Sequence, residues 1–374
     1  MLIFDGDYPA CVAVRLNADL TQPIQTVRAA PPAGMASEDP RYQSNLMASV
    51  PEQRRAGVAA FIGKLNARIH RPGAQLWGHR SGELAYAEAW GQFSFYRIME
   101  RRGNYRILAT AADLADHMQG WEAAERAGAG FDGLPVGVII GLEGADPILD
   151  TESLEEFHAA GLRIVSLTHY DTSAYGHGTG TGTDGGLFPP ADRLFADMSR
   201  LGIVLDATHA SDATIAQALD RFDGPVIATH QNCRALVPGE RQFPDEVLRA
   251  IIERDGVIGV SMDTAMLYRG GIDWADVVGL QRPFGKEDVT LDDLADHVDH
   301  ICQLAGDVRH AGIGGDTDGQ GGRTGAPAEI DTVVDYNRLA DVLARRGYGD
   351  DQVTDVMYRN WVRFFSRHLD GPSS

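Results

Sequence analysis

Metal-binding residue types follow most of the short apolar stretches of this chain, each at the point where a buried strand would end. They are Asp5 and Asp7, Glu143, His169, His209, His230, and Asp316 with Asp318. A single histidine in such a place is more often structural than a ligand. Six of the eight predicted strands end in this way, and this repetition predicts a metal centre at one rim of the fold.

The mixture of imidazoles and carboxylates favours zinc, because Mg²⁺ is bound mostly through oxygen atoms. The set is larger than one tetrahedral ion needs, so we expect two zinc ions about 3.5–4 Å apart, sharing a carboxylate and a hydroxide. In many such barrels a carbamylated lysine is the bridge. The two lysines of this chain, Lys64 and Lys286, follow none of the predicted strands, so Glu143 is the predicted bridge.

Eight apolar stretches predict the strands that must position these side chains. They cover residues 2–4, 105–109, 136–142, 162–168, 202–206, 225–229, 256–260 and 311–315. Apolar residues with helical spacing follow several of them, at residues 154–160, 191–200, 210–219, 245–254 and 291–305. Continuous apolar runs are typical of parallel strands that are buried on both faces. The alternation therefore favours a (β/α)₈ TIM-type barrel over a doubly wound open sheet.

The segment between the first two predicted strands, about a hundred residues, is longer than an ordinary crossover. Within it, residues 51–69 and 81–102 predict two long helices, and we interpret about residues 10–102 as a helical insertion packed on a single domain, 1–374. Residues 175–186, rich in glycine and threonine, predict a second insertion in the loop after the fourth strand. Ser153 with Glu156 predicts a capping box for the helix that follows.

Composition limits the partners of the protein. The chain has 33 basic and 53 acidic residues, a net charge of −20, which disfavours nucleic acid and anionic membrane surfaces. It has no apolar run of about 20 residues. Residues 1–7 lack the basic start of a signal peptide, and three widely spaced cysteines argue against a disulfide framework. We therefore expect a cytoplasmic protein that binds neither nucleic acid nor membrane.

The sequence resembles the membrane (renal) dipeptidase family of zinc peptidases, among the amidohydrolase-like barrels. The matching segments are residues 141–144 (GLEG), 167–169 (LTH), 200–211 (RLGIVLDATHAS), 225–230 (PVIATH) and 314–319 (GGDTDG), with Arg241 shortly before Pro244 and Asp245. They run in the family's order from about residue 135 to the C-terminus.

The resemblance implies roles for these side chains. Glu143 would bridge two zinc ions, and His209 and His230 would complete one of the two sites. Asp316 would transfer protons, and His169 would bind the substrate by polarising the scissile carbonyl. Arg241 would bind the C-terminal carboxylate of the substrate; from the residues alone it could equally form a surface ion pair with Glu240 or Asp245. Asp318 is expected only to cap its turn.

The first strand departs from the family's pattern, which ends in a His-x-Asp pair within Asp-Gly-His-Asn-Asp that binds the second zinc. Here the strand is followed by Asp5, Gly6 and Asp7. Either Asp5 and Asp7 replace the pair at the same spacing, or two residues are deleted and only Asp7 remains. Because side chains alternate along a strand, we expect both carboxylates to point into the barrel mouth and bind metal.

The sequence thus predicts a zinc dipeptidase in which a metal-bridging hydroxide attacks the peptide carbonyl. The resemblance implies a dipeptide with a free C-terminal carboxylate and tolerance of a D-residue at that position. Hydrolysis of other amides or lactones stays open, as does a degenerate barrel with one metal that binds peptides without cleaving them. An isomerase or aldolase with a phosphate loop at residues 314–322 is disfavoured by the three histidines. A homodimer is compatible with the sequence.

Overall fold

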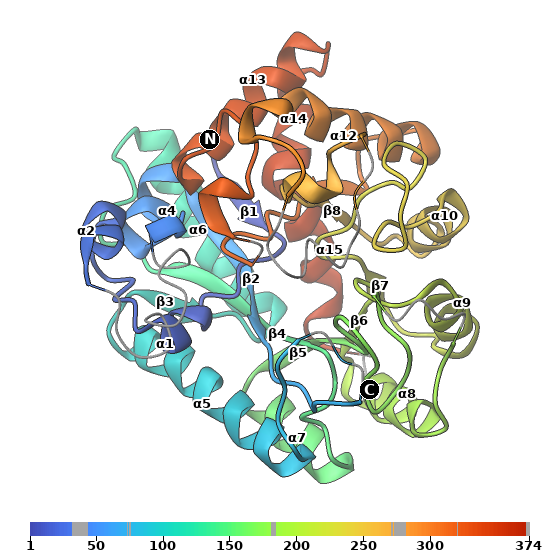
Figure 1. Ribbon diagram of the computed structural model, residues 1–374. Coiled ribbons are helices and arrows are strands. Elements are labelled where there is room, and N and C mark those ends of the chain that lie inside the picture. Colours follow the sequence, from blue (N-terminus) through green and yellow to red (C-terminus); the bar gives the residue numbers. More distant parts are fainter. Residues whose placement is uncertain are drawn as a thin grey trace.

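Eight parallel strands form a barrel at the centre of the protein (Figure 1). The computed structural model describes residues 1–31, 44–72, 74, 76–180, 185–270, 272, 282–319 and 321–371. The strands are β1 (Ile3–Asp5), β2 (Val58–Leu65), β4 (Val136–Glu143), β5 (Leu162–Ser166), β6 (Val204–Asp206), β7 (Val226–Ile227), β8 (Ile258–Val260) and β9 (Ala311–Ile313), in the order β7-β6-β5-β4-β2-β1-β9-β8. An isolated parallel bridge between Ala228 and Ile258 joins the two ends. The predicted TIM-type barrel is confirmed.

Strand β2 corrects the sequence prediction, which placed a long helix over residues 51–69. Helix α4 (Val50–Ala56) ends at Gly57, whose φ of 83° suits glycine, and the chain enters β2 directly. All eight residues of β2 are buried, and a short apolar run without a polar face does not distinguish a buried strand from a helix. Strand β3 (Tyr105–Ile107), predicted as the second barrel strand, pairs with the start of β4 outside the barrel path.

Helices surround the barrel and cover the apolar outer faces of its strands (Figure 1). Those between β1 and β4 are α1 (Val12–Leu16), α2 (Ile24–Ala29), α4, α5 (Gly82–Arg101) and α6 (Ala111–Ala127). The later ones are α7 (Thr151–Ala160), α8 (Pro190–Leu201), α9 (Asp212–Arg221), α10 (Asp245–Glu253), α12 (Leu291–Ala305), α13 (Asn337–Arg345), α14 (Asp350–Thr354) and α15 (Asn360–His368). The predicted helices over 81–102, 154–160, 191–200, 210–219, 245–254 and 291–305 are confirmed within a few residues. The insertion predicted over residues 10–102 contains the barrel strand β2 as well as helices.

The capping box of α7 is shifted from the predicted position. Asp150, in extended conformation, is the N-cap and accepts from Ser153 N at 2.9 Å, and the Ser153 hydroxyl oxygen accepts from Asp150 N at 3.0 Å. Ser153 is therefore the third residue of the helix and not its cap. Residues 181–184 of the loop predicted after the fourth strand lie outside the described residues.

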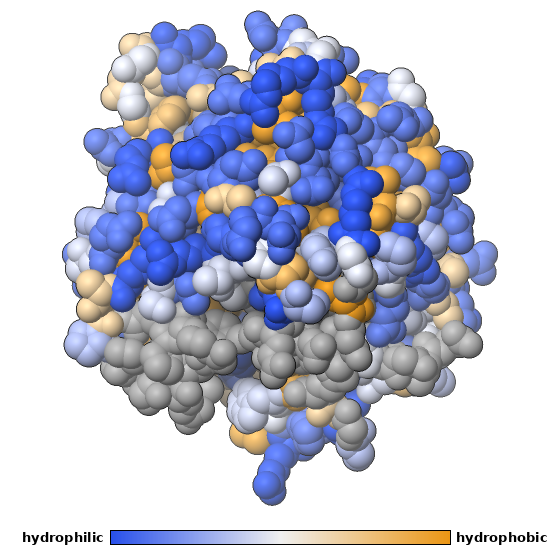
Figure 2. Space-filling model, turned by 45° about the horizontal axis from the view of Figure 1, so that its top comes forward, coloured by the Kyte–Doolittle hydropathy of each residue, from blue (hydrophilic) through white to orange (hydrophobic). Residues whose placement is uncertain are grey.

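The C-terminal helix stabilises the first and last strands of the barrel. The Phe4 ring in β1 stacks on Trp361 and Phe365 of α15, and the Trp361 indole donates to Ile313 O at 2.9 Å. The space-filling view shows mostly hydrophilic residues on its face, with hydrophobic residues in small groups (Figure 2). None of the described helices is long and apolar enough to cross a bilayer.

Candidate metal centre

Three side chains from neighbouring strand ends form the centre of the site. Glu143 is the last residue of β4, and His209 and His230 follow β6 and β7. Glu143 Oε1 lies 3.5 Å from His209 Nε2 and 3.4 Å from His230 Nε2, and the two Nε2 atoms are 3.0 Å apart. Ligands about 2.0–2.2 Å from a tetrahedral zinc ion stand about 3.3 Å from one another. The spacing of these three atoms therefore fits one zinc ion.

The charge states of Glu143 and His209 also fit a metal, whereas Asp7 and Asp316 outweigh burial and raise the pKa of His230 above its usual value. Burial acts to raise the pKa of Glu143, but the nearby His169, His230 and Lys64 outweigh it and bring this pKa to about 2. Burial, assisted by Arg241, holds the pKa of His209 well below its usual value. The ionised carboxylate and the neutral imidazole are the forms that bind metal. His209 Nδ1 has no hydrogen-bond partner among the described residues.

His209 reaches this position at a cost to its backbone. Its φ of 68° lies in the left-handed region, which side chains with a Cβ seldom adopt. Such conformations cost of order 1–3 kcal/mol and persist where the surrounding structure imposes them, often at functional sites. The Thr168 and Thr179 hydroxyls both donate to His209 O, each at 3.1 Å, and hold the turn.

His169 lies beside this triangle, at the rim. Its Nε2 is 3.9 Å from Glu143 Oε2, and its ring centroid is 4.3 Å from that of His209. Burial and the neighbouring Arg68 hold the pKa of His169 well below its usual value, so its ring is neutral. His169 is 14% exposed at its side chain, whereas His209 and His230 are 3% and 1% exposed. This is where a substrate group would first meet the site.

The two acidic residues after β1 have different surroundings. Asp7 Oδ2 lies 3.0 Å from His230 Nδ1, so Asp7 joins Glu143 and His230 in a group within reach of one ion. Asp5 instead accepts from Gly315 N at 2.9 Å and from the Thr317 hydroxyl at 2.8 Å. Both Asp5 oxygens are used to hold the loop after β9. The structure therefore does not bring Asp5 to the cluster, and it favours the alternative in which Asp7 alone remains.

Arg241 belongs to the site and not to the surface. It is 1% exposed, donates to Gln231 Oε1 at 2.7 Å and to His230 O at 3.0 Å, and places Nη2 3.5 Å from His209 Nε2. The Arg241 Nε atom has no hydrogen-bond partner among the described residues. A surface ion pair with Glu240 or Asp245 is thus excluded. The guanidinium is in place to meet an anionic group at the metal centre.

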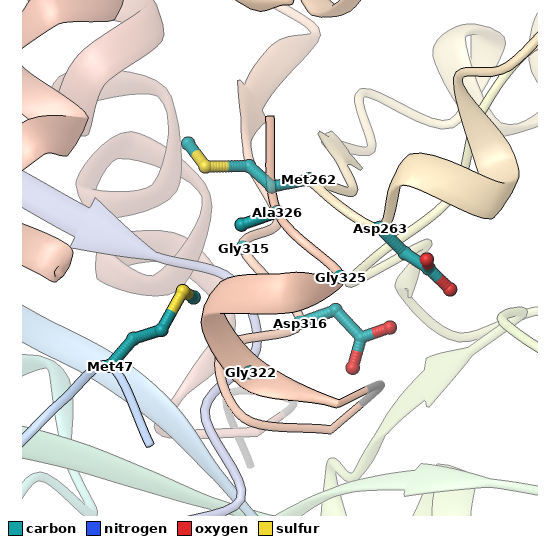
Figure 3. Close-up of a pocket in the computed structure, with 8 residues that line it drawn as sticks. All are labelled: Met47, Met262, Asp263, Gly315, Asp316, Gly322, Gly325 and Ala326. Atoms are coloured by element: carbon teal, nitrogen blue, oxygen red, sulfur yellow. The ribbon is translucent and has the colours of Figure 1, made fainter. Parts of the chain in front are cut away.

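Asp316 completes the predicted set. It follows β9 with a left-handed φ of 56° and lines a small pocket with Asp263, Met47 and Met262. Figure 3 shows the two carboxylates on the same side of that pocket. Burial, with the negative charges of Asp7 and Asp263, outweighs His230 and holds the pKa of Asp316 well above its usual value. A protonated Asp316 is equipped to donate a proton.

Asp318 was expected to cap its own turn, but its carboxylate binds a segment that is distant in sequence. Its two oxygens accept from Met47 N at 2.6 Å and Ala48 N at 3.3 Å. It ties the loop after β9 to the chain before α4 and, among the described residues, belongs to neither group of side chains close enough to hold one metal ion.

The later part of the chain matches one known family. Residues 96–369 match the model described as membrane dipeptidase, peptidase family M19. The chain belongs to this family. An uncharacterised dipeptidase of Schizosaccharomyces pombe is 29% identical over 235 residues, 62% of this chain and 53% of the relative. The dipeptidase aclJ of Aspergillus oryzae is 30% identical over 228 residues, 60% of this chain and 50% of the relative. The matched region thus spans about half the length of these relatives.

Two solved metallopeptidase structures, the first of them from peptidase family M19, share the fold along almost the whole chain. The metallopeptidase called dipeptidase AC has a TM-score of 0.76 at 24% identity and covers 99% of both chains. A metallopeptidase from Rhodobacter sphaeroides, liganded with a phosphinate mimic of L-Ala-D-Ala, has a TM-score of 0.75 at 22% identity and covers 98% of this chain and 99% of the other. At these identities the likeness concerns the barrel architecture.

Sequence reasoning missed three buried charged residues at the site. Lys64 is in β2, next to its last residue, so the statement that no lysine lies at a strand end is wrong. Asp206, the last residue of β6, accepts from Lys64 Nζ. The apolar run before Asp206 could have revealed it, whereas Lys64 was hidden by the helix predicted over β2. Asp263, three residues after β8, accepts from Arg282 at 2.9 Å.

Proposed function

We propose that this protein is a zinc-dependent dipeptidase. The observation that carries the proposal is the triangle of Glu143, His209 and His230, with sides of 3.0–3.5 Å, at the strand ends of a membrane dipeptidase barrel. The 30% identical Aspergillus oryzae dipeptidase and the dipeptide mimic bound to the Rhodobacter sphaeroides structure support it.

The residues around the triangle divide the remaining work of peptide hydrolysis. When bound, a zinc ion supplies Lewis acidity and lowers the pKa of water. The neutral His169 donates a hydrogen bond to the scissile carbonyl oxygen as negative charge develops there. Arg241 binds the C-terminal carboxylate through its guanidinium. The raised pKa of Asp316 lets it give a proton to the leaving amine.

The proposed substrate is a dipeptide with a free C-terminal carboxylate, and a D-residue at that position is accepted. The liganded relative, which holds an L-Ala-D-Ala mimic, supports this stereochemistry. The same machinery would serve other amides or lactones. Arg241 separates these cases, because a substrate without a carboxylate cannot use it. A cytoplasmic location, a single domain and a homodimer stay predictions from the sequence.

The decisive experiment is a metal analysis of the purified protein together with a screen of L-Xaa-L-Xaa and L-Xaa-D-Xaa dipeptides. We expect chelation to abolish hydrolysis and zinc to restore it. Full activity of metal-free protein would contradict the proposal, as would hydrolysis of lactones with no dipeptide cleaved.

Two zinc ions, the expectation from the sequence, require a second set of donors beside the triangle. The candidates are Asp7, and His169 at the rim, each sharing Glu143 with the triangle. The contacts of Asp7 decide whether its carboxylate is free to bind a second metal ion.

A further inference from the structure

Lys64 lies inside the barrel beside the candidate metal centre. Its side chain is 0% exposed. The ammonium donates to Asp206 Oδ2 and, at 3.4 Å, to the Ser166 hydroxyl, and its Nζ is 3.7 Å from Asp7 Oδ2. The carboxylate that ends β6 and the carboxylate that follows β1 therefore share one buried cation. Without the ammonium both would need another source of positive charge.

Asp7 has the geometry of an outer partner to a metal ligand. Its Oδ2 is 3.0 Å from Nδ1 of His230, while the other ring nitrogen of His230, Nε2, faces Glu143 Oε1 at 3.4 Å. Metal-binding histidines commonly donate their second ring N–H to a carboxylate, which fixes the orientation of the ring. The Thr229 hydroxyl lies 3.1 Å from the same Nδ1 atom, so Asp7 faces His230 as a charge partner, on the side away from the triangle.

The donors left for a second ion are then few. Glu143 Oε2 and His169 Nε2, 3.9 Å apart, are what the triangle does not use. Glu143 Oε2 also accepts from Asn66 Nδ2 at 2.9 Å. Zinc sites in proteins take three or four protein ligands. This pair falls short of that number.

An ion bound by Asp7 would also stand close to the ammonium. Zinc–oxygen bonds are about 2.0–2.2 Å long. Because Asp7 Oδ2 is 3.7 Å from Lys64 Nζ, such an ion would lie within about 6 Å of the nitrogen. The ammonium and the ion would then compete for the charge of one carboxylate in a water-poor interior.

We propose that the ammonium of Lys64 takes the place of a second metal ion, so that the protein binds one divalent ion per chain, at Glu143, His209 and His230. This inference rests on the proposed function only in assuming that a divalent ion is the cofactor. It accounts for the altered first strand: a fixed cation from β2 neutralises Asp7, and no second imidazole is needed after β1.

The same contacts exclude the other role that a lysine has in such barrels, a carbamate bridge. A carbamate forms only on a neutral amine. Burial acts to lower the pKa of Lys64, but Asp206, Asp7 and Glu143 outweigh it and hold this pKa above its usual value. Lys64 also forms a buried ion pair with Asp206, a contact that a carbamate, itself an anion, would turn into a repulsion.

Metal stoichiometry tests the proposal without an activity assay. The apoprotein is loaded with excess zinc, desalted and analysed for zinc and protein. We expect about one tightly bound ion per chain. Loading with Co²⁺ should give the paramagnetic resonance signal of isolated ions. Two tight ions per chain, or exchange-coupled cobalt, would overturn the proposal.

Variants of Lys64 test its role directly. Lys64→Ser removes the charge and opens space, and we expect it to bind a second ion with a coupled cobalt signal. Lys64→Arg keeps the charge and should stay at one ion. In Lys64→Ser, Asp206 keeps the hydrogen bonds that it accepts from Thr208 and Thr229 at 2.7–3.0 Å, and the second ion would supply the positive charge. A folded Lys64→Ser protein that binds a single ion would show that the ammonium does not exclude a second metal ion.

Asp7→Asn decides the matter if Lys64→Ser does not fold. If Asp7 is an outer partner, Asp7→Asn should lower the metal affinity about 10–100-fold. The number of bound ions per chain should stay at one. A fall from two ions to one would make Asp7 a ligand. One ion without dipeptide hydrolysis would refute the proposed function alone, and two ions with hydrolysis would refute this inference alone. Absence of any metal would refute both.

Discussion

The two sides of the barrel mouth carry similar residue types and use them differently. On the side of β4, β6 and β7, the Glu143, His209 and His230 ligand atoms converge within 3.5 Å. On the side of β1, β2 and β9, Asp5 is bonded to the loop after β9, and Asp7 lies between His230 and Lys64.

The difference shows that a strand-end carboxylate is not a ligand by position alone. What the neighbouring strand places opposite decides its role. On the side of β4, the imidazoles that follow β6 and β7 face Glu143 Oε1 at 3.5 and 3.4 Å. Beside β1, strand β2 supplies an ammonium, and the loop after β9 supplies hydrogen-bond donors.

Glu143→Gln should have the largest effect. It tests the side of the barrel mouth where the Glu143, His209 and His230 atoms converge. The change removes the negative charge that faces both imidazoles. We expect metal affinity to fall by more than the roughly 10–100-fold that loss of an outer partner costs, with hydrolysis lost. Zinc titration with a competing chelator measures this. Unchanged zinc affinity would mean that Glu143 is not a ligand.

Arg241→Ala should leave the metal in place and weaken the binding of dipeptide substrates. Losing a buried charged partner costs about 2 kcal/mol or more, roughly 30-fold in kcat/KM for dipeptides. Dipeptide amides, which lack the carboxylate, should be poor substrates of the wild-type protein and lose little more in the variant. Equal wild-type rates on acid and amide would remove Arg241 from substrate binding.

Asp318→Ala should act on stability alone, because Asp318 holds the chain before α4 to the loop after β9. Two buried N–H groups, of Met47 and Ala48, lose their acceptor, and each such loss costs about 1–3 kcal/mol. Denaturant unfolding measures the change, and Asp318→Asn, which keeps one acceptor, is the milder control. Loss of zinc from the folded variant would place Asp318 in the metal centre.

Asp5→Asn should have the smallest effect, a change in the pH dependence of stability. Burial raises the pKa of Asp5 to about 7, against the hydrogen bonds from Thr317 and Asp7 N that lower it. The unfolded carboxyl has a pKa of about 3.9, so the folded state binds the proton more tightly. Wild-type stability relative to Asp5→Asn should therefore fall as pH rises from about 4 to 7.

Unfolding free energies of both proteins at several pH values in this range give the difference. A constant difference would contradict the raised pKa. Zinc content should be equal in the two proteins, and halved zinc in Asp5→Asn would make Asp5 a ligand after all.

The sequence alone was sufficient for seven of the eight barrel strands and for the candidate residues on one side of the barrel mouth. The continuous apolar runs before Glu143, His209 and His230 specify three strands. They also place these three side chains together, since parallel strands put their carboxyl ends at one rim. Apolar spacing likewise specified α8, α9, α10 and α12. These are local signals, and neighbouring residues carry them.

Only the tertiary structure decided β2 and the roles of Asp5, Asp7 and Lys64. The run Val58–Leu65 has no polar face, so its sequence fits a buried helix as well as a strand, and pairing with β1 and β4 makes it a strand. The carboxylates of the site accept hydrogen bonds from residues far away in the sequence. Glu143 accepts from Asn66, 77 residues away, and Asp5 accepts from Gly315, 310 residues away. These distant partners decide whether a carboxylate binds a metal ion, is protonated or pairs with an ammonium, because a buried carboxylate is not solvated by water.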